Sequence, residues 1–143
     1  MTAAAEPTGV SSAASFVRTP GKLKELSPSA LRAFKDIARA WKLTSYEQRI
    51  VLGVIPQSTY TKYMRDPDGA ALSFDTLSRI SILLGIFKAI NILLPNAEIA
   101  DAWVSKPNAH PLFKGKSAKD LMLDGSMENL AAVRAYLDAE RGW

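Results

Sequence analysis

The segment between Ser73 and Pro95 constrains the fold of this chain more than any other. Its apolar run, from Ile80 to Leu94, is interrupted only by Ser81, Gly85, Lys88 and Asn91. The run is shorter than the roughly 20 apolar residues that a membrane span needs. A helix that is apolar on nearly all sides must be covered on nearly all sides. We therefore expect a buried helical spine at the centre of the molecule.

The boundaries of this spine follow from its flanking residues. Ser73 is a good N-cap, and the predicted inward stripe comprises Phe74, Leu77, Ile80 and Leu84. Gly85 predicts a break, with a following helix through Ile90 that ends at Pro95.

A first amphipathic helix is predicted upstream, from about 28 to 42. Ser27-Pro28 has the pattern of an N-cap followed by proline at the first helical position. The apolar residues Leu31, Phe34, Ala38 and Trp41 recur at helical spacing. Its outer face carries Arg32, Lys35 and Arg39, for which a solvated surface is the simplest interpretation.

Two short helices with a tight turn between them should follow. Thr44 and Glu47 have the spacing of a capping box, which starts a helix that runs to about Leu52. Gly53 supplies the freedom for a sharp turn, and a second helix starts at 56–59 and is stopped by the turn residues 66–69.

This arrangement matches a helix-turn-helix, in which the second helix enters the major groove by its N-terminal end. Gln57, Ser58 and Thr59 would face base edges or phosphates, and Lys62 and Arg65 would reach the DNA backbone. The stretch from about Leu31 to Leu94 resembles Xre-type helix-turn-helix regulators. Since such proteins commonly read two half-sites, part of the spine is a candidate homodimer surface.

The charge distribution agrees with two different partners. Residues 18–65 carry a net charge of +7, whereas residues 66–143 carry −2. A basic half favours a nucleic-acid partner, although a plain helical bundle with a solubilising basic face has the same signature.

The last 48 residues, 96–143, are too few to hold a solid core alone. Short helices are predicted from about 97 to 105, after the cap Ser117 with Asp120, and after the cap Ser126, with a Lys- and Pro-rich loop over 106–116. The segment must therefore pack on the spine or on another protein.

This C-terminal run resembles the toxin-binding domain of Xre/MbcA/ParS-type antitoxins. The match is carried by Trp103, Pro107-Asn108, the 113–117 and 121–125 segments, the 133–138 segment and the closing Arg141-Gly142-Trp143. The resemblance implies an antitoxin that binds and neutralises a RES-type toxin, which attacks NAD, and that represses its own operon. It also implies a toxin-binding surface, for which the candidate residues are Phe113, Lys114, Arg134, Arg141, Gly142 and Trp143.

Trp143 leaves two alternatives open. A terminal tryptophan after a flexible glycine can act as an aromatic plug that docks into the partner, or it can fold back against the last helix.

Catalysis and metal binding are not expected. His110 is the only histidine and there is no cysteine, so no multi-histidine or thiolate metal site can form. No Gly-rich phosphate loop appears, and we expect no catalytic residue and no cofactor. His110 should lie on a loop surface or at the partner interface.

The prediction is therefore an all-α protein. Residues 1–20 form a disordered tail, 21–95 an Xre-like helix-turn-helix bundle with its spine, and 96–143 a small helical toxin-binding domain. The expected setting is cytoplasmic, without a signal peptide or membrane span, and the expected partners are a toxin, operator DNA and a second copy of the chain. Two alternatives remain: a stand-alone regulator whose C-terminal domain only dimerises, and an interaction module with a vestigial helix-turn-helix.

Overall fold

The computed structural model describes residues 18–142, and this part of the chain is all-α, as predicted. Its helices are α2 (Pro20–Ala40), α3 (Ser45–Val51), α4 (Gln57–Arg65), α5 (Phe74–Leu93), α6 (Ala97–Trp103), α7 (Ala118–Met122) and α8 (Met127–Glu140). Two short 3₁₀ turns, η1 (Pro67–Gly69) and η2 (Pro111–Phe113), complete the order. The prediction of a tail over residues 1–20 concerns mostly residues outside the described range.

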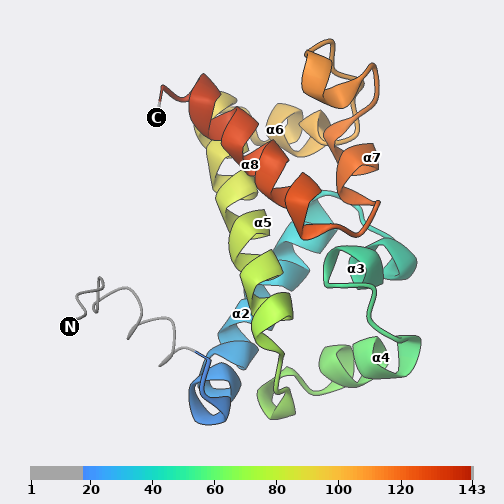
Figure 1. Ribbon diagram of the computed structural model, residues 1–143, viewed down its shortest axis with the longest axis vertical. Helices are drawn as coiled ribbons and strands as arrows, with labels where there is room; N and C mark the ends of the chain where they lie inside the picture. The colour runs from blue at the N-terminus through green and yellow to red at the C-terminus, as the bar shows by residue number, and fades with distance from the viewer. Residues whose placement is uncertain (1–17, 143) are drawn as a thin grey trace, which may run out of the picture.

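Helix α5 is the centre of the molecule. It packs against α2 on one side and α8 on another, and α3 lies beside the turn that leads into α8, with α4 beyond it (Figure 1). One hydrophobic core joins Phe34 of α2, Leu83 and Ile86 of α5, and Leu130 and Val133 of α8, each fully buried. The C-terminal segment therefore packs on the spine, as its small size required.

The predicted start of the first helix was wrong. Helix α2 begins at Pro20 with Thr19 as its N-cap, so Pro28 lies inside the helix. Ser27 is fully buried; its hydroxyl donates to the Leu23 carbonyl (2.6 Å) and accepts from the Leu72 amide (2.9 Å). The serine of the Ser-Pro pair that suggested a helix start instead links α2 to the segment before α5 by a hydrogen bond.

The predicted break at Gly85 was also wrong, because α5 runs unbroken from Phe74 to Leu93. A Cβ atom on Gly85 would lie 1.8 Å from Nη1 and 2.3 Å from Cζ of Arg134. The missing side chain at Gly85 therefore leaves room for the guanidinium of Arg134 on α8, and the glycine does not break the helix.

Of the apolar residues predicted to face inward on α5, one at its centre is exposed instead. Leu84 is 38% exposed, whereas Leu83 is fully buried. The buried residues of the helix are Thr76, Arg79, Ile80, Leu83, Ile86, Ala89 and Ile90.

Helix α5 is long and apolar enough to cross a membrane by length and composition alone. Its packing indicates another role, since α2 and α8 cover it and it carries Arg79, which is 9% exposed and paired with Asp75 at 2.8 Å. It is the core helix of a folded domain.

Gly85→Ala tests the contact with Arg134. Alanine favours a helix over glycine by about 1 kcal/mol, but in the wild-type background the new methyl displaces the guanidinium from α5. We expect Gly85→Ala to destabilise the protein by roughly 1–3 kcal/mol, and to stabilise it by up to about 1 kcal/mol when Arg134 is alanine. Chemical denaturation of the four proteins of the cycle measures this coupling, and additive effects would contradict the contact.

Candidate functional site

The helix-turn-helix geometry arises from local capping and one strained turn. The Thr44 hydroxyl accepts from the Glu47 amide (3.1 Å), and the Glu47 carboxylate accepts from the Thr44 amide (2.9 Å), so the predicted capping box is present. Helix α3 ends in a turn with Gly53 at φ +118° and Val54 at φ +56°. Both backbone conformations are left-handed, and Val54 is β-branched, so the turn is held by its surroundings.

Helix α4 presents a polar face to solvent. Gln57, Ser58, Lys62 and Arg65 are exposed, as a surface available to DNA requires. Thr59 is half-buried, whereas Thr61 is exposed. Residues two apart lie on opposite sides of a helix, so Thr61 occupies the face on which the sequence prediction had placed Thr59. The spacing from Gln57 to Thr61 is the signal that could have identified it.

The opposite face of α4 packs inward through Tyr60, Tyr63 and Met64. The Tyr60 hydroxyl donates to Gln48 Oε1 (2.8 Å), which ties α4 to α3. Burial raises the pKa of Tyr63 above its ordinary value of 10.0, so this phenol is uncharged at neutral pH.

A notch of about 310 Å³ lies between α3 and α4. It is lined by Ser45, Tyr46, Arg49, Gln57, Tyr60 and Thr61. Arg49 donates from Nε to the Ile55 carbonyl (2.9 Å), and its guanidinium lies 6.0 Å from the centre of the Tyr46 ring. Hydroxyl, amide and guanidinium groups of this kind contact base edges and phosphates in DNA complexes.

An aromatic cluster organises the C-terminal segment. Phe113 is fully buried and packs edge-to-face on Tyr136 (5.1 Å between ring centres) and on Trp103 (6.1 Å). Trp103 and Tyr136 stack at 6.4 Å, and His110 lies 4.7 Å from Tyr136. His110 also caps η2, since its Nδ1 accepts from the Leu112 amide at 3.1 Å. The sequence placed His110 on a loop but gave no sign of this cluster, which joins residues from three separate segments.

The candidate toxin-binding residues fall into three groups. Phe113 lies in the core, where it supports the loop and does not face solvent. Arg134 pairs with Asp138 (3.1 Å), and Arg141, only 9% exposed, lies 3.9 Å from the same carboxylate. Lys114 and Gly142 are exposed, and Trp143 lies outside the described residues.

Lys114 combines exposure with backbone strain. Its φ is +51°, a left-handed conformation that costs a non-glycine residue energy, and it is followed by Gly115 at φ +82°. The exposed lysine is thus fixed at the tip of a tight turn that the chain closes with an antiparallel bridge between Pro107 and Ser117.

Three contacts fasten the helix-turn-helix to the C-terminal segment. Lys119 of α7 pairs with Glu47 of α3 at 3.1 Å. Arg79 Nη1 donates to the Gly125 carbonyl (2.7 Å). Gly125 also lies so close to Val54 that a Cβ on it would be 3.0 Å from the valine methyl. The strained turn of the helix-turn-helix therefore rests on the turn between α7 and α8.

Glu47 belongs to both the capping box and the contact with α7. Partial burial would raise its pKa, but the Thr44 amide and the Lys119 ammonium outweigh this effect and hold the pKa below its ordinary value of 4.5. The ionised carboxylate is thus the form that the folded protein stabilises.

The fold and these surfaces define a helix-turn-helix protein joined to a helical binding domain, and comparison with known families agrees. Residues 22–85 match the family model of the antitoxin Xre-like helix-turn-helix domain, and residues 89–142 match that of the antitoxin Xre/MbcA/ParS C-terminal toxin-binding domain. The chain is 42% identical over 115 residues to the uncharacterized protein y4oB of Sinorhizobium fredii (strain NBRC 101917 / NGR234), an alignment that covers 80% of this chain and 86% of that protein.

The chain belongs to the Xre-like antitoxin family, with a DNA-binding helix-turn-helix and a C-terminal toxin-binding domain. The resemblance inferred from its sequence is thereby confirmed at the level of this architecture. Both matched domains are binding domains from families that are typically not enzymes.

Glu47→Gln tests the role of the ionised carboxylate. A carboxyl whose pKa is depressed by folding contributes stability above its unfolded pKa and loses it as the pH falls through the folded pKa. We expect the variant to be less stable by about 1–2 kcal/mol at pH 7, and the difference from wild type to vanish at pH values below the depressed pKa. Denaturation curves across this pH range measure the effect. The matched control is Glu25→Gln, whose carboxylate is 66% exposed in a surface pair with Lys22, and an equal loss in both variants would contradict the assignment.

Proposed function

We propose that this antitoxin neutralises a RES-type, NAD-consuming toxin by placing its C-terminal tail in the toxin active site. The geometry of the chain end supports the proposal. Helix α8 packs on α5, and its C-cap Arg141 lies 3.9 Å from Asp138 in the last turn. The next residue, Gly142, is exposed at φ +85° with no atom within 4 Å of a Cβ built on it. We therefore expect a partner that binds Trp143 to meet a helix end that is already ordered, which limits the entropy lost on binding.

The loop before α7 suits an acidic partner surface. The loop that precedes α7 carries three exposed lysines, Lys106, Lys114 and Lys116. The half-buried rings of Trp103 and Tyr136 lie behind it. Aromatic anchors with a charged rim are the usual composition of a strong interface.

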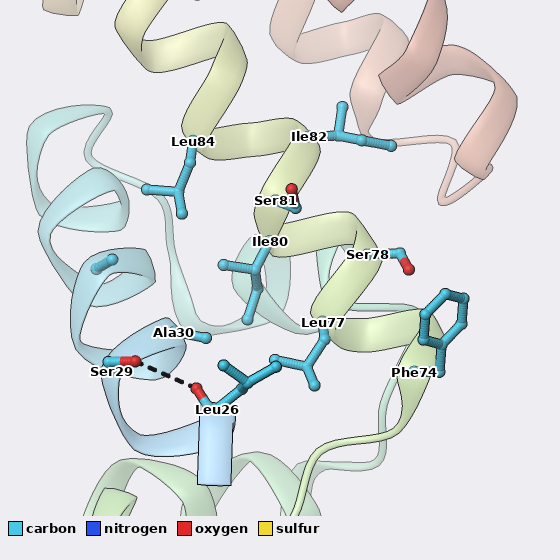
Figure 2. Close-up of a pocket in the computed structure, with 11 residues that line it drawn as sticks. Leu26, Ser29, Ala30, Phe74, Leu77, Ser78, Ile80, Ser81, Ile82 and Leu84 are labelled. Atoms are coloured by element: carbon cyan, nitrogen blue, oxygen red, sulfur yellow. Dashed lines mark hydrogen bonds between the residues drawn. The ribbon is translucent and has the colours of Figure 1, made fainter. Parts of the chain in front are cut away.

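We also propose that the protein represses its own operon as a homodimer. A groove of about 750 Å³ lies between α2 and the first half of α5, and none of its lining residues is charged. Figure 2 shows Leu77, Ile80 and Leu84 along one wall, with Leu26 and Ala30 of α2 opposite them. A second copy is the occupant that fits best, because a two-fold pair of helix-turn-helix domains reads two half-sites.

Removal of Gly142 and Trp143 tests the plug. Gly142 is exposed and lies outside the core. We expect the truncation to weaken inhibition by at least about tenfold, as the loss of a tryptophan anchor implies, and to lower the melting temperature much less. The measurement is NAD consumption by the purified cognate toxin during titration with each antitoxin. Lys62→Ala, altered only on α4, is the control and should inhibit fully. Full neutralisation by the truncated protein would refute the plug.

Leu84→Glu tests the dimer. A carboxylate in an uncharged groove must be desolvated when a second copy packs there, so the variant should be monomeric where the wild type is dimeric. Light scattering after gel filtration gives the mass. Ile92→Glu is the matched control, since Ile92 is 50% exposed on the same helix but outside the groove. A dimeric Leu84→Glu protein, or a monomeric wild type, would rule out this interface.

A further inference from the structure

A second, basic groove lies beside the helix-turn-helix, between the end of α2 and the inner edge of α4. It has a volume of about 540 Å³. Its lining comprises Lys35, Ala38, Arg39, Lys42, Leu43, Thr44, Gln48, Tyr60 and Met64, so three of the residues are cations and none is an acid. We propose that this groove binds phosphates of the DNA backbone next to the bases that α4 contacts. The proposal rests on the DNA binding of the helix-turn-helix and extends it to a helix outside that motif.

The position of the groove makes it continuous with the candidate base-reading surface. Tyr60 lines both the groove and the notch between α3 and α4. On the α2 side, Lys35 and Arg39 are four residues apart and so lie on one face of the helix, and Lys42, just past the helix end, lines the same groove. A DNA strand whose bases contact Gln57 and Thr61 would continue across Tyr60 toward these cations.

The polar groups in the base of the groove are already satisfied within the protein. The Tyr60 hydroxyl donates to Gln48, and the Gln48 side-chain amide donates to the Leu43 carbonyl (3.0 Å). The side-chain ammonium groups of Lys35 and Lys42, by contrast, form no hydrogen bond or ion pair with any described residue. Their charges are therefore available to a ligand.

Arg39 is only weakly held. It pairs with Asp36 at 3.0 Å, but the two side chains are 74% and 76% exposed. Such surface pairs contribute little and are screened by salt, so a phosphate can compete for the guanidinium. Arg32, on the same outer face of α2, lies outside the groove and is paired with Asp68.

The backbone of Lys42 gives independent support. The Leu43 amide bonds to the Ala38 carbonyl (2.9 Å) and the Lys42 amide to the Arg39 carbonyl (3.2 Å), which is the Schellman pattern of a helix end. Lys42 occupies the left-handed position of that motif, at φ +55°, where glycine is the usual residue. Folding alone favours glycine at this position, so an exposed lysine here agrees with a binding role for its ammonium group.

Two substitutions separate binding from folding. Lys35→Ala removes an available charge, and Lys42→Gly removes a charge while relieving the backbone, so the melting temperature of Lys42→Gly should be equal to or above that of wild type. The probes are two labelled duplexes of equal length, one from the region upstream of the protein's own gene and one of random sequence. Fluorescence anisotropy is measured between about 50 and 200 mM salt.

Each substitution should flatten the slope of log affinity against log salt by about 0.9. Affinity should fall by roughly threefold or more, and by the same factor for both duplexes, because phosphates carry no sequence information. Lys62→Ala on α4 serves as a comparison within the motif. Lys24→Ala is the matched control: Lys24 is exposed on the same helix, eleven residues or about 16 Å before Lys35, and its loss should leave the slope unchanged.

If the wild type binds both duplexes and neither Lys35→Ala nor Lys42→Gly changes the salt slope, the proposal that the groove binds phosphates is overturned, whereas DNA binding by the helix-turn-helix stands. A slope lowered equally by Lys24→Ala would reduce the effect to net charge and would also overturn it. If the wild type bound neither duplex, DNA binding itself would fail and the groove with it.

Discussion

The rest of the structure depends on the burial of α5. This helix is apolar on almost every side, and burial of such a surface contributes about 25 cal/mol for each Å² removed from water. Neither half of the chain can supply that cover alone: α2 covers one side and α8 another. The requirement explains why two separately recognisable family domains, 22–85 and 89–142, share one core.

The polar contacts of α5 determine how α8 is oriented on it. Arg134 of α8 lies in the space left by Gly85, and Arg79 reaches the Gly125 carbonyl in the turn before α8. Arg79 is buried, and a buried guanidinium requires specific partners, because leaving it unpaired would cost several kcal/mol. These two arginines therefore fix the position of α8 on α5 more specifically than apolar packing alone can do.

One consequence concerns the relation between the two interaction surfaces. The capping box of α3 is joined to α7 through Glu47 and Lys119, and the strained Val54 turn rests on Gly125. The helix-turn-helix and the C-terminal segment are thus packed together as parts of one body. A partner bound to one surface occupies a fixed position relative to a partner bound to the other.

The sequence by itself determined the features that depend on interactions between residues close together in the chain. Capping residues marked the starts of α3, α5, α7 and α8, Gly53 marked the sharp turn, and the helical spacing of apolar residues marked the class of fold, since these signals act within one or two turns of chain. Only the tertiary structure decided the use of residues whose partners are distant in sequence. Ser27 suggested a helix start, but its hydroxyl binds the Leu72 amide. Gly85 suggested a break, but it leaves room for the Arg134 guanidinium. Phe113 suggested an interface, but it is the buried centre of an aromatic cluster. Thr59 and Lys42 follow the same rule, because which face of a helix meets solvent, and which charge is left unpaired, depends on what the rest of the chain packs beside it.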